Sequence, residues 1–185
     1  MTGLAIIIAV IGSKESGKTT TIEALVKGLT KQNYRIGTVK HVPEPNFTID
    51  TEGTDTWRHV QAGARKTAIV APKELAIIKK VDTADFELRE ILESYGNHVD
   101  IIILEGFRNL VRNEASVAKI AAVKTSKEAI ETLKNFKSVI AFAATSMLAN
   151  RVARELKIPA VDVLKEPEKL VEIVLDHISL HNKRQ

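Results

Sequence analysis

Eight consecutive residues near the start of the chain have the types and spacing of a phosphate-binding loop. Gly12, Gly17, Lys18 and Thr19 occupy the fixed positions of the pattern G-x-x-x-x-G-K-[ST]. In such a loop backbone N–H groups surround the phosphates, the lysine reaches the β- and γ-phosphates, and the hydroxyl binds Mg²⁺. A glycine turn that merely joins a strand to a helix is the alternative. The candidate binding residues are Gly12, Ser13, Lys14, Glu15, Ser16, Gly17, Lys18, Thr19 and Thr20, of which Lys14 and Glu15 are expected to contribute only backbone N–H groups.

A carboxylate follows a second strongly apolar run. Residues 99–104 are apolar apart from Asp100, and Glu105 stands where the run stops. In a parallel sheet this position lies at the carboxyl edge, which also carries the phosphate loop. A triphosphate site needs a second carboxylate there, to hold Mg²⁺ through water or to polarise the attacking group. We assign this role to Glu105, with a residue that only begins a surface loop as the alternative, and we expect Asp100 to be a strand-start or solvated residue.

A third acidic candidate lies in the long polar segment of residues 41–55. Asp50 and Gly53 form a D-x-x-G element, whose aspartate approaches Mg²⁺ and whose glycine amide approaches the γ-phosphate in switching GTPases. A turn or capping role for Asp50 is an equal alternative. Asp55 is a candidate N-cap of the helix that follows.

Three basic residues are expected at the same sheet edge. Lys40 and His41 end the predicted second strand and could contact substrate or phosphate. Arg108 could stabilise charge on a transferred phosphoryl group, or it is a solvated loop cation.

Apolar runs of strand length alternate with stretches of helical period, which predicts a three-layer α/β/α fold with a mostly parallel sheet. The expected strands are 4–11, 34–40, 99–104, 117–123, 138–143 and 160–163. The expected helices are one with an apolar stripe over 22–29, and 56–62, 88–95, 127–134, 146–156 and 167–178. Residues 67–71 and 75–80 predict an antiparallel hairpin. Since no repeat or flexible linker interrupts the chain, we expect one nucleotide-binding domain over residues 1–185.

The composition excludes several classes of site. The chain has 185 residues, a net charge of +4 and no cysteine, which excludes disulfides, thiolate nucleophiles and sulfur-ligated zinc. No apolar run is long enough to span a membrane. Aromatic residues make up only 4% of the chain, and the basic residues are scattered. We therefore expect a soluble, cytoplasmic protein that binds neither membranes nor nucleic acid. The choice between guanine and adenine does not follow from the residues, since the chain lacks an Asn/Thr-Lys-x-Asp element.

These motifs, in this order, resemble the GTP-binding B proteins of molybdopterin-guanine dinucleotide biosynthesis. The resemblance spans residues 3–108 and is less specific at 118–120 and 139–143; its parts are residues 12–20, 37–41, 50–56, 62–64 and 104–108. It implies a P-loop NTPase fold of a dimer-forming class, GTP and Mg²⁺ as ligands, and slow GTP hydrolysis. It also implies that molybdopterin, or the guanylyltransferase that modifies it, is a partner, together with a second copy of the chain.

The chain departs from this family at two places. Relatives often carry a further histidine where this chain has residues 42–45, Val-Pro-Glu-Pro. They often have Ser-Asp where this chain has Ala144 and Thr145, so the side chain that would read the guanine base is in question.

The sequence thus predicts a GTP-binding, slowly hydrolysing accessory protein of molybdenum cofactor biosynthesis. Lys18, Glu105 and Asp50 are its catalytic candidates, and Thr19, Glu105 and Asp50 its metal ligands. Catalysis would rest on positioning and electrostatic stabilisation. Two rivals remain: a P-loop kinase acting on a small metabolite, and a nucleotide-gated binding adaptor without significant catalysis.

Overall fold

The computed structural model describes residues 5–83 and 87–182, and the chain divides into two compact units. The larger unit comprises residues 1–41 and 88–185, and the smaller comprises residues 42–87. The single domain expected over residues 1–185 stays a prediction.

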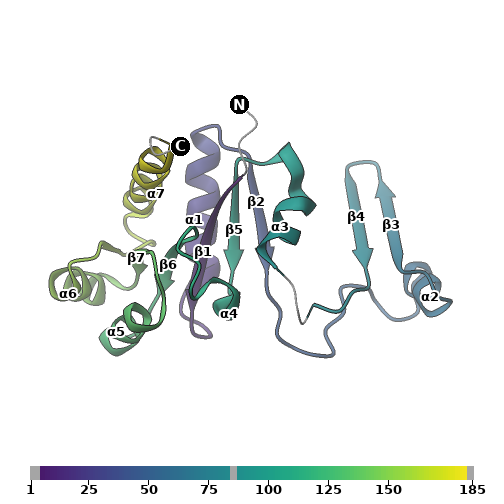
Figure 1. Ribbon diagram of the computed structural model, residues 1–185, viewed down its shortest axis with the longest axis horizontal. Helices are drawn as coiled ribbons and strands as arrows, with labels where there is room; N and C mark the ends of the chain where they lie inside the picture. The colour runs from purple at the N-terminus through teal and green to yellow at the C-terminus, as the bar shows by residue number, and fades with distance from the viewer. Residues whose placement is uncertain (1–4, 84–86, 183–185) are drawn as a thin grey trace. The chain divides into compact units, whose positions relative to one another are not determined.

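A six-stranded sheet forms the centre of the larger unit, in the order β2-β5-β1-β6-β7-β8 (Figure 1). All its strand pairs are parallel. Because β1 lies between β5 and β6, the loop that follows β1 is flanked by the ends of both neighbours. The strands are β1 (Ile6–Gly12), β2 (Ile36–Lys40), β5 (Ile101–Glu105), β6 (Ala118–Ala122), β7 (Val139–Ala143) and β8 (Ala160–Val161).

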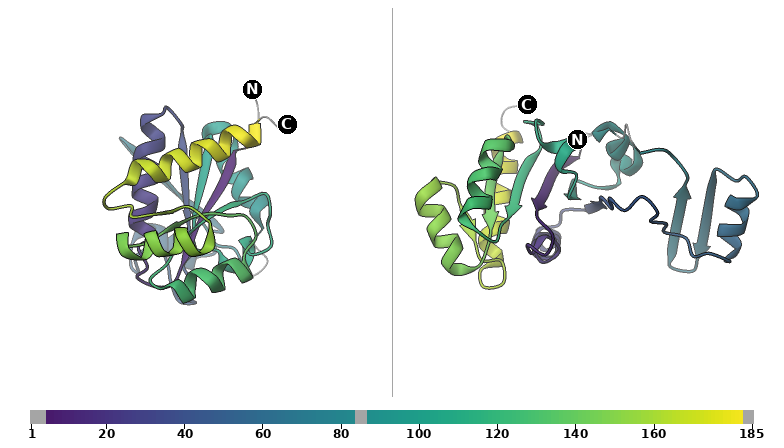
Figure 2. Two further views of the ribbon diagram at one scale, coloured as in Figure 1. Left: turned by 90° about the vertical axis from the view of Figure 1, so that its left-hand side faces the viewer. Right: turned by 90° about the horizontal axis from the view of Figure 1, so that it is seen from below.

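Helices cover both sides of this sheet (Figure 2). On one side α1 (Lys18–Lys31) and α7 (Pro167–Asn182) pack together over alternate residues of the strands. The apolar stripe of α1 places Leu25 and Leu29 in this core, and both are fully buried. The other helices of this unit are α3 (Leu88–Tyr95), the 3-10 helix η1 (Gly96–His98), α4 (Arg108–Val111), α5 (Ser126–Asn135) and α6 (Ser146–Leu156).

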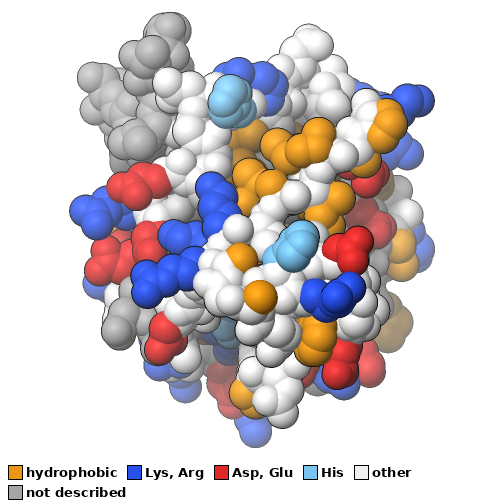
Figure 3. Space-filling view, turned by 90° about the vertical axis from the view of Figure 1, so that its right-hand side faces the viewer, with side chains coloured by type: hydrophobic (Ala, Val, Ile, Leu, Met, Phe, Trp, Pro, Cys, Tyr) orange, Lys and Arg blue, Asp and Glu red, His pale blue; other side chains and the backbone are white. Residues whose placement is uncertain are grey.

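The smaller unit contains α2 (Asp55–Gln61) and an antiparallel hairpin of β3 (Lys66–Ala71) and β4 (Glu74–Lys79). Val70 pairs with Leu75 and Ala68 with Ile77, so these four side chains share one face of the hairpin. Val70, Leu75 and Ile77 are 81%, 64% and 55% exposed. Figure 3 shows exposed hydrophobic side chains gathered on the face of the molecule that is turned toward the viewer.

The α/β fold, the parallel sheet and the hairpin confirm the sequence prediction. Every predicted strand and helix lies within a few residues of an observed one, although Leu4 lies outside the described residues. The prediction missed α4 and η1, which are too short to show a period. It was wrong about the start of α2, because the hydroxyl of Thr54, not Asp55, accepts the N–H of Trp57 as the N-cap. No helix in the described ranges is long and apolar enough to cross a membrane.

Candidate phosphate-binding site

The phosphate loop is shaped by two glycines. A Cβ on Gly12 would lie 2.4 Å from the carbonyl oxygen of Ala122 and 2.4 Å from the hydroxyl of Ser16, so no side chain fits there. Gly17 has φ +91°, a left-handed conformation that costs other residues about 1–2 kcal/mol. The chain can therefore turn tightly from β1 into α1 only with glycine at these positions.

The loop ends at an open helix N-terminus. Gly17 is the N-cap of α1, and no side chain caps the helix there. The first N–H groups of an α-helix have no partner within the helix, and its dipole favours an anion at this end. Within the described part of the chain, the buried hydroxyl of Ser16 also lacks a hydrogen-bond partner. The loop thus offers unpaired donors of the kind that a phosphate group accepts.

Lys18 points back into the loop. Its Nζ donates a hydrogen bond of 2.7 Å to the carbonyl oxygen of Ser13. Burial lowers the pKa of the Lys18 ammonium from its usual value; Glu105 opposes this shift, while Lys40, Arg108 and Lys124 add to it. Lys18 thus lies among several other cations, an arrangement that suits a polyanionic ligand.

Glu105 lies beside the first turn of α1, as the sequence predicted. Its Oε1 accepts the hydroxyl of Thr19 at 3.3 Å and lies 3.6 Å from the Nζ of Lys40. The strand register explains this cluster, because Glu105 is paired with Lys40 of β2 on one side and with Val10 of β1 on the other. The Glu105 side chain is only 16% exposed. The acidic and hydroxyl ligands expected for Mg²⁺ thus meet at the carboxyl edge of the sheet.

This pair fits a magnesium ion held jointly with a nucleotide. No cluster of three or more His, Cys, Asp or Glu side chains that could hold a metal occurs in residues 5–83 and 87–182. Mg²⁺ does not need such a cluster, since it commonly keeps several waters and takes one or two protein ligands together with phosphate oxygens. Thr19 and Glu105 would be those protein ligands.

Asp50 lies in the smaller unit and organises a turn there. Its Oδ1 accepts hydrogen bonds from the N–H of Thr51 and from the hydroxyls of Thr54 and Thr56. This is the turn role that the sequence left open. The Asp50 side chain is 8% exposed, and its Oδ2 has no hydrogen-bond partner among the described residues. The metal role of Asp50 stays a prediction.

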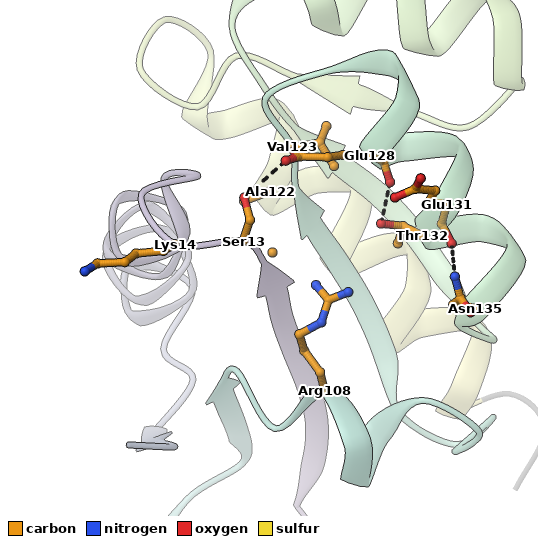
Figure 4. Close-up of a pocket in the computed structure, with 10 residues that line it drawn as sticks. Ser13, Lys14, Arg108, Ala122, Val123, Glu128, Glu131, Thr132 and Asn135 are labelled. Carbon is orange, nitrogen blue, oxygen red and sulfur yellow. Dashed lines mark hydrogen bonds between the residues drawn. The ribbon is translucent and has the colours of Figure 1, made fainter. Parts of the chain in front are cut away.

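The two other basic candidates near Glu105 have neighbours of their own. The His41 ring lies 5.2 Å from the ring of Phe107, and the backbone N–H of His41 donates to the carbonyl oxygen of Glu105. The guanidinium of Arg108 lies 5.0 Å from the centre of the Phe136 ring, a cation–π contact. Arg108 extends from α4 toward a hollow of about 470 Å³ beside the phosphate loop (Figure 4).

Two residues that hold the loop, Lys124 and Glu128, were not predicted from the sequence. Glu128 of α5 accepts the hydroxyl of Ser13 at 3.3 Å and the N–H of Lys124 at 2.7 Å. The Nζ of Lys124 donates to the carbonyl oxygen of Lys14. A signal existed, because Thr125 and Glu128 have the T-x-x-E spacing of a capping box directly after β6. Asp100 was expected to be a strand-start or solvated residue, but it forms a bidentate ion pair with Arg35.

Solved structures share this fold. A MobB homologue from Bacillus stearothermophilus aligns with a TM-score of 0.66 and 20% identity over 94% of this chain and 98% of that chain. MobB of Bacillus subtilis aligns with a TM-score of 0.68 and 24% identity over 90% of this chain and 96% of that chain.

Sequence relatives are named as molybdopterin-guanine dinucleotide biosynthesis adapter proteins. The relative from Methanocaldococcus jannaschii is 34% identical over 119 residues, which are 64% of this chain and 47% of that protein. The relative from Haemophilus influenzae is 27% identical over 103 residues, or 55% of this chain and 57% of that protein. The chain therefore spans about half the length of these relatives.

The family model described as molybdopterin guanine dinucleotide synthesis protein B matches residues 7–145. This range begins within β1 and ends just after β7, so it includes the phosphate loop, Asp50 and Glu105. The chain is therefore a member of the molybdopterin guanine dinucleotide synthesis protein B family.

Proposed function

We propose that this protein binds GTP with Mg²⁺, hydrolyses it slowly, and acts as an accessory protein in molybdenum cofactor biosynthesis. One observation supports nucleotide binding above all. The open N-terminus of α1, the ammonium of Lys18 and the Thr19–Glu105 pair converge on one loop. Backbone amides, a cation and a metal-binding pair together suit a triphosphate.

In this proposal each residue has a separate task. The loop amides and Lys18 bind the β- and γ-phosphates, and Thr19 and Glu105 hold Mg²⁺, which would neutralise charge on the phosphates. Asp50 remains a candidate for organising Mg²⁺ and the attacking water on the strength of its D-x-x-G motif alone. Catalysis would rest on positioning and electrostatic stabilisation, and the slow rate is the one that the family resemblance implies.

The partners belong to the same proposal. The names of the relatives support a role as an adapter for molybdopterin or for the guanylyltransferase that modifies it. The exposed apolar face of the β3–β4 hairpin supports a homodimer, because contiguous exposed apolar surface commonly marks an interface. We further place the protein in the cytoplasm. Sedimentation tests the dimer, and co-purification tests the pterin partner.

Nucleotide binding is tested by titrating GTP and ATP, each with Mg²⁺ and with EDTA, into the wild type and Lys18→Ala. Lys14→Ala is the matched control, because Lys14 carries the same charge in the same loop but points away from the hollow (Figure 4). We expect GTP to bind more tightly than ATP, and Lys18→Ala to lose about 30-fold or more in affinity. Preference for ATP, or full affinity in Lys18→Ala, would contradict the proposal.

A nucleotide-gated adaptor without catalysis is the second candidate, and the name adapter protein favours it. The two candidates differ in one measurement. Release of phosphate from GTP faster than in protein-free buffer, and lost in Glu105→Gln, supports the hydrolytic form. A rate equal to that of buffer supports the adaptor.

A further inference from the structure

The carboxylate of Glu128 joins the phosphate loop to the end of β6. Its Oε2 accepts the backbone N–H of Lys124, just after β6, and its Oε1 accepts the hydroxyl of Ser13. The backbone N–H of Glu128 is itself held by the hydroxyl of Thr125, the N-cap of α5. The carboxylate is therefore fixed at its base by the helix start and is directed at the loop. Figure 4 shows it reaching from α5 to Ser13.

Ser13 connects this carboxylate to Lys18. While the hydroxyl of Ser13 donates to Glu128, its carbonyl oxygen accepts the ammonium of Lys18 at 2.7 Å. A second bond runs alongside, from the Nζ of Lys124 to the carbonyl oxygen of Lys14. The tip of the loop is thus hydrogen-bonded to the segment after β6 at two successive residues, Ser13 and Lys14.

We propose that Glu128 is a positioning residue of the nucleotide site, which holds the phosphate loop in its anion-accepting shape before the ligand arrives. This inference rests on the proposed function and adds a residue to it. A loop held in its bound shape loses less conformational entropy on binding, so its affinity is higher.

Electrostatics alone predicts the opposite role. A carboxylate near a polyphosphate repels it, so its removal should tighten nucleotide binding. If Glu128 positions the loop, its removal should weaken nucleotide binding. Both of its carboxylate oxygens accept hydrogen bonds, from Ser13 and from Lys124, and these bonds would be lost. The sign of the effect of Glu128→Ala therefore separates the two.

The control is Glu131, one helical turn further along α5. It lines the same hollow, but within residues 5–83 and 87–182 its carboxylate makes no hydrogen bond to the phosphate loop. Its carbonyl oxygen accepts a hydrogen bond from the side chain of Asn135. We expect Glu128→Ala to weaken binding of GTP with Mg²⁺ about tenfold, and Glu131→Ala to leave it unchanged or slightly tighter. Tighter or unchanged binding in Glu128→Ala would overturn the proposal.

A double-mutant cycle tests whether Glu128 acts through Ser13. Ser13→Ala should weaken nucleotide binding, and adding it to Glu128→Ala should cost little more, because both changes break the same bond. Fully additive losses would overturn the proposed link. If Glu128 had a merely structural role, Glu128→Ala would lower thermal stability, but its effect on nucleotide affinity would not depend on whether Ser13 is present.

Hydrogen exchange of the nucleotide-free protein keeps the two proposals distinguishable. Glu128→Ala should speed amide exchange in residues 13–17 and not in the sheet core, whereas Glu131→Ala should change neither. If the wild type bound no nucleotide, the proposed function would fail, and exchange in the loop would still decide whether Glu128 holds it. Unchanged exchange in Glu128→Ala would overturn the inference in either case.

Discussion

The strands of the larger unit and the hairpin of the smaller unit are both rich in apolar residues, but their surroundings differ. In β5, Ile101, Ile102, Ile103 and Leu104 are fully buried, because helices cover both faces of the sheet. In the hairpin, Val70 and Leu75 are largely exposed, and α2 contains no buried residue. A segment as short as residues 42–87 exposes much of its surface because it cannot enclose a full core.

The two units hold their candidate functional residues in position by different means. Glu105 is fixed by the buried strand that precedes it and by the register with β1 and β2. Asp50 is held by local hydrogen bonds from three nearby residues of its own segment. The core of the larger unit thus fixes the position of the candidate site residue, whereas the smaller unit presents a locally folded turn and an apolar face.

The largest effect is expected from truncating the core of the larger unit. Ile103→Ala would remove a fully buried side chain from between α1 and its sheet neighbours. We expect a loss of about 2–5 kcal/mol in the free energy of unfolding, measured by urea titration, because a cavity remains. A loss below about 1 kcal/mol would show that this core is not tightly packed, and the contrast with the hairpin would then fail.

The next effect concerns the metal. Glu105→Gln keeps the shape of the side chain and removes its charge, so we expect the affinity for GTP to fall about tenfold with Mg²⁺. In EDTA we expect it to stay unchanged or to rise slightly, because a negative charge near the phosphates is removed. Asp50→Asn is the matched variant in the smaller unit. An equal, Mg²⁺-dependent loss in Asp50→Asn would show that both units supply the metal site, while a loss in Glu105→Gln alone would assign it to the larger unit.

A third effect depends on pH. A hydrogen bond from the hydroxyl of Ser146 lowers the pKa of Asp162 from its usual 3.8. The N–H groups of Leu164 and Ser146 and the charge of Lys165 also lower this pKa, whereas burial raises it. A lowered pKa in the folded state means that this contribution to stability is present above pH 3.8 and is lost as the pH falls through the folded value.

Asp162→Ala should therefore cost about 1 kcal/mol of unfolding free energy near neutral pH, as for a lost helix cap, and progressively less in acid. Unfolding titrations of both proteins between neutral pH and strong acid provide the comparison. A cost that stayed constant over this range would contradict the assigned role of the carboxylate.

The smallest effect is expected on the hairpin. Leu75 is 64% exposed, so Leu75→Ser should change the free energy of unfolding by no more than about 0.5 kcal/mol in dilute protein. In concentrated protein the same change should weaken self-association, which sedimentation velocity measures. A large loss of stability at all concentrations would mean that this face is covered within one chain.

Much of this architecture follows from local patterns. The run from Ile6 to Ile11 is apolar on both faces of a strand and ends in the phosphate-loop motif, so the strand, the loop and the following helix could be predicted together. The hairpin followed in the same way from two apolar runs around Pro72, Lys73 and Glu74. By contrast, α4 has a single turn, and no period can show in four residues.

The sequence by itself determined the chemistry of the phosphate loop and the order of the strands along the chain, because a glycine pattern and an apolar run are local properties. Only the tertiary structure decided which side chains meet. The register of β1 between β5 and β6 brings Glu105 to Thr19 and Glu128 to Ser13. The folded chain also buries Lys119 completely, and its ammonium donates to the carbonyl oxygen of Glu114. Such contacts join residues far apart in the chain, and strand order and register in space, not local sequence, set them.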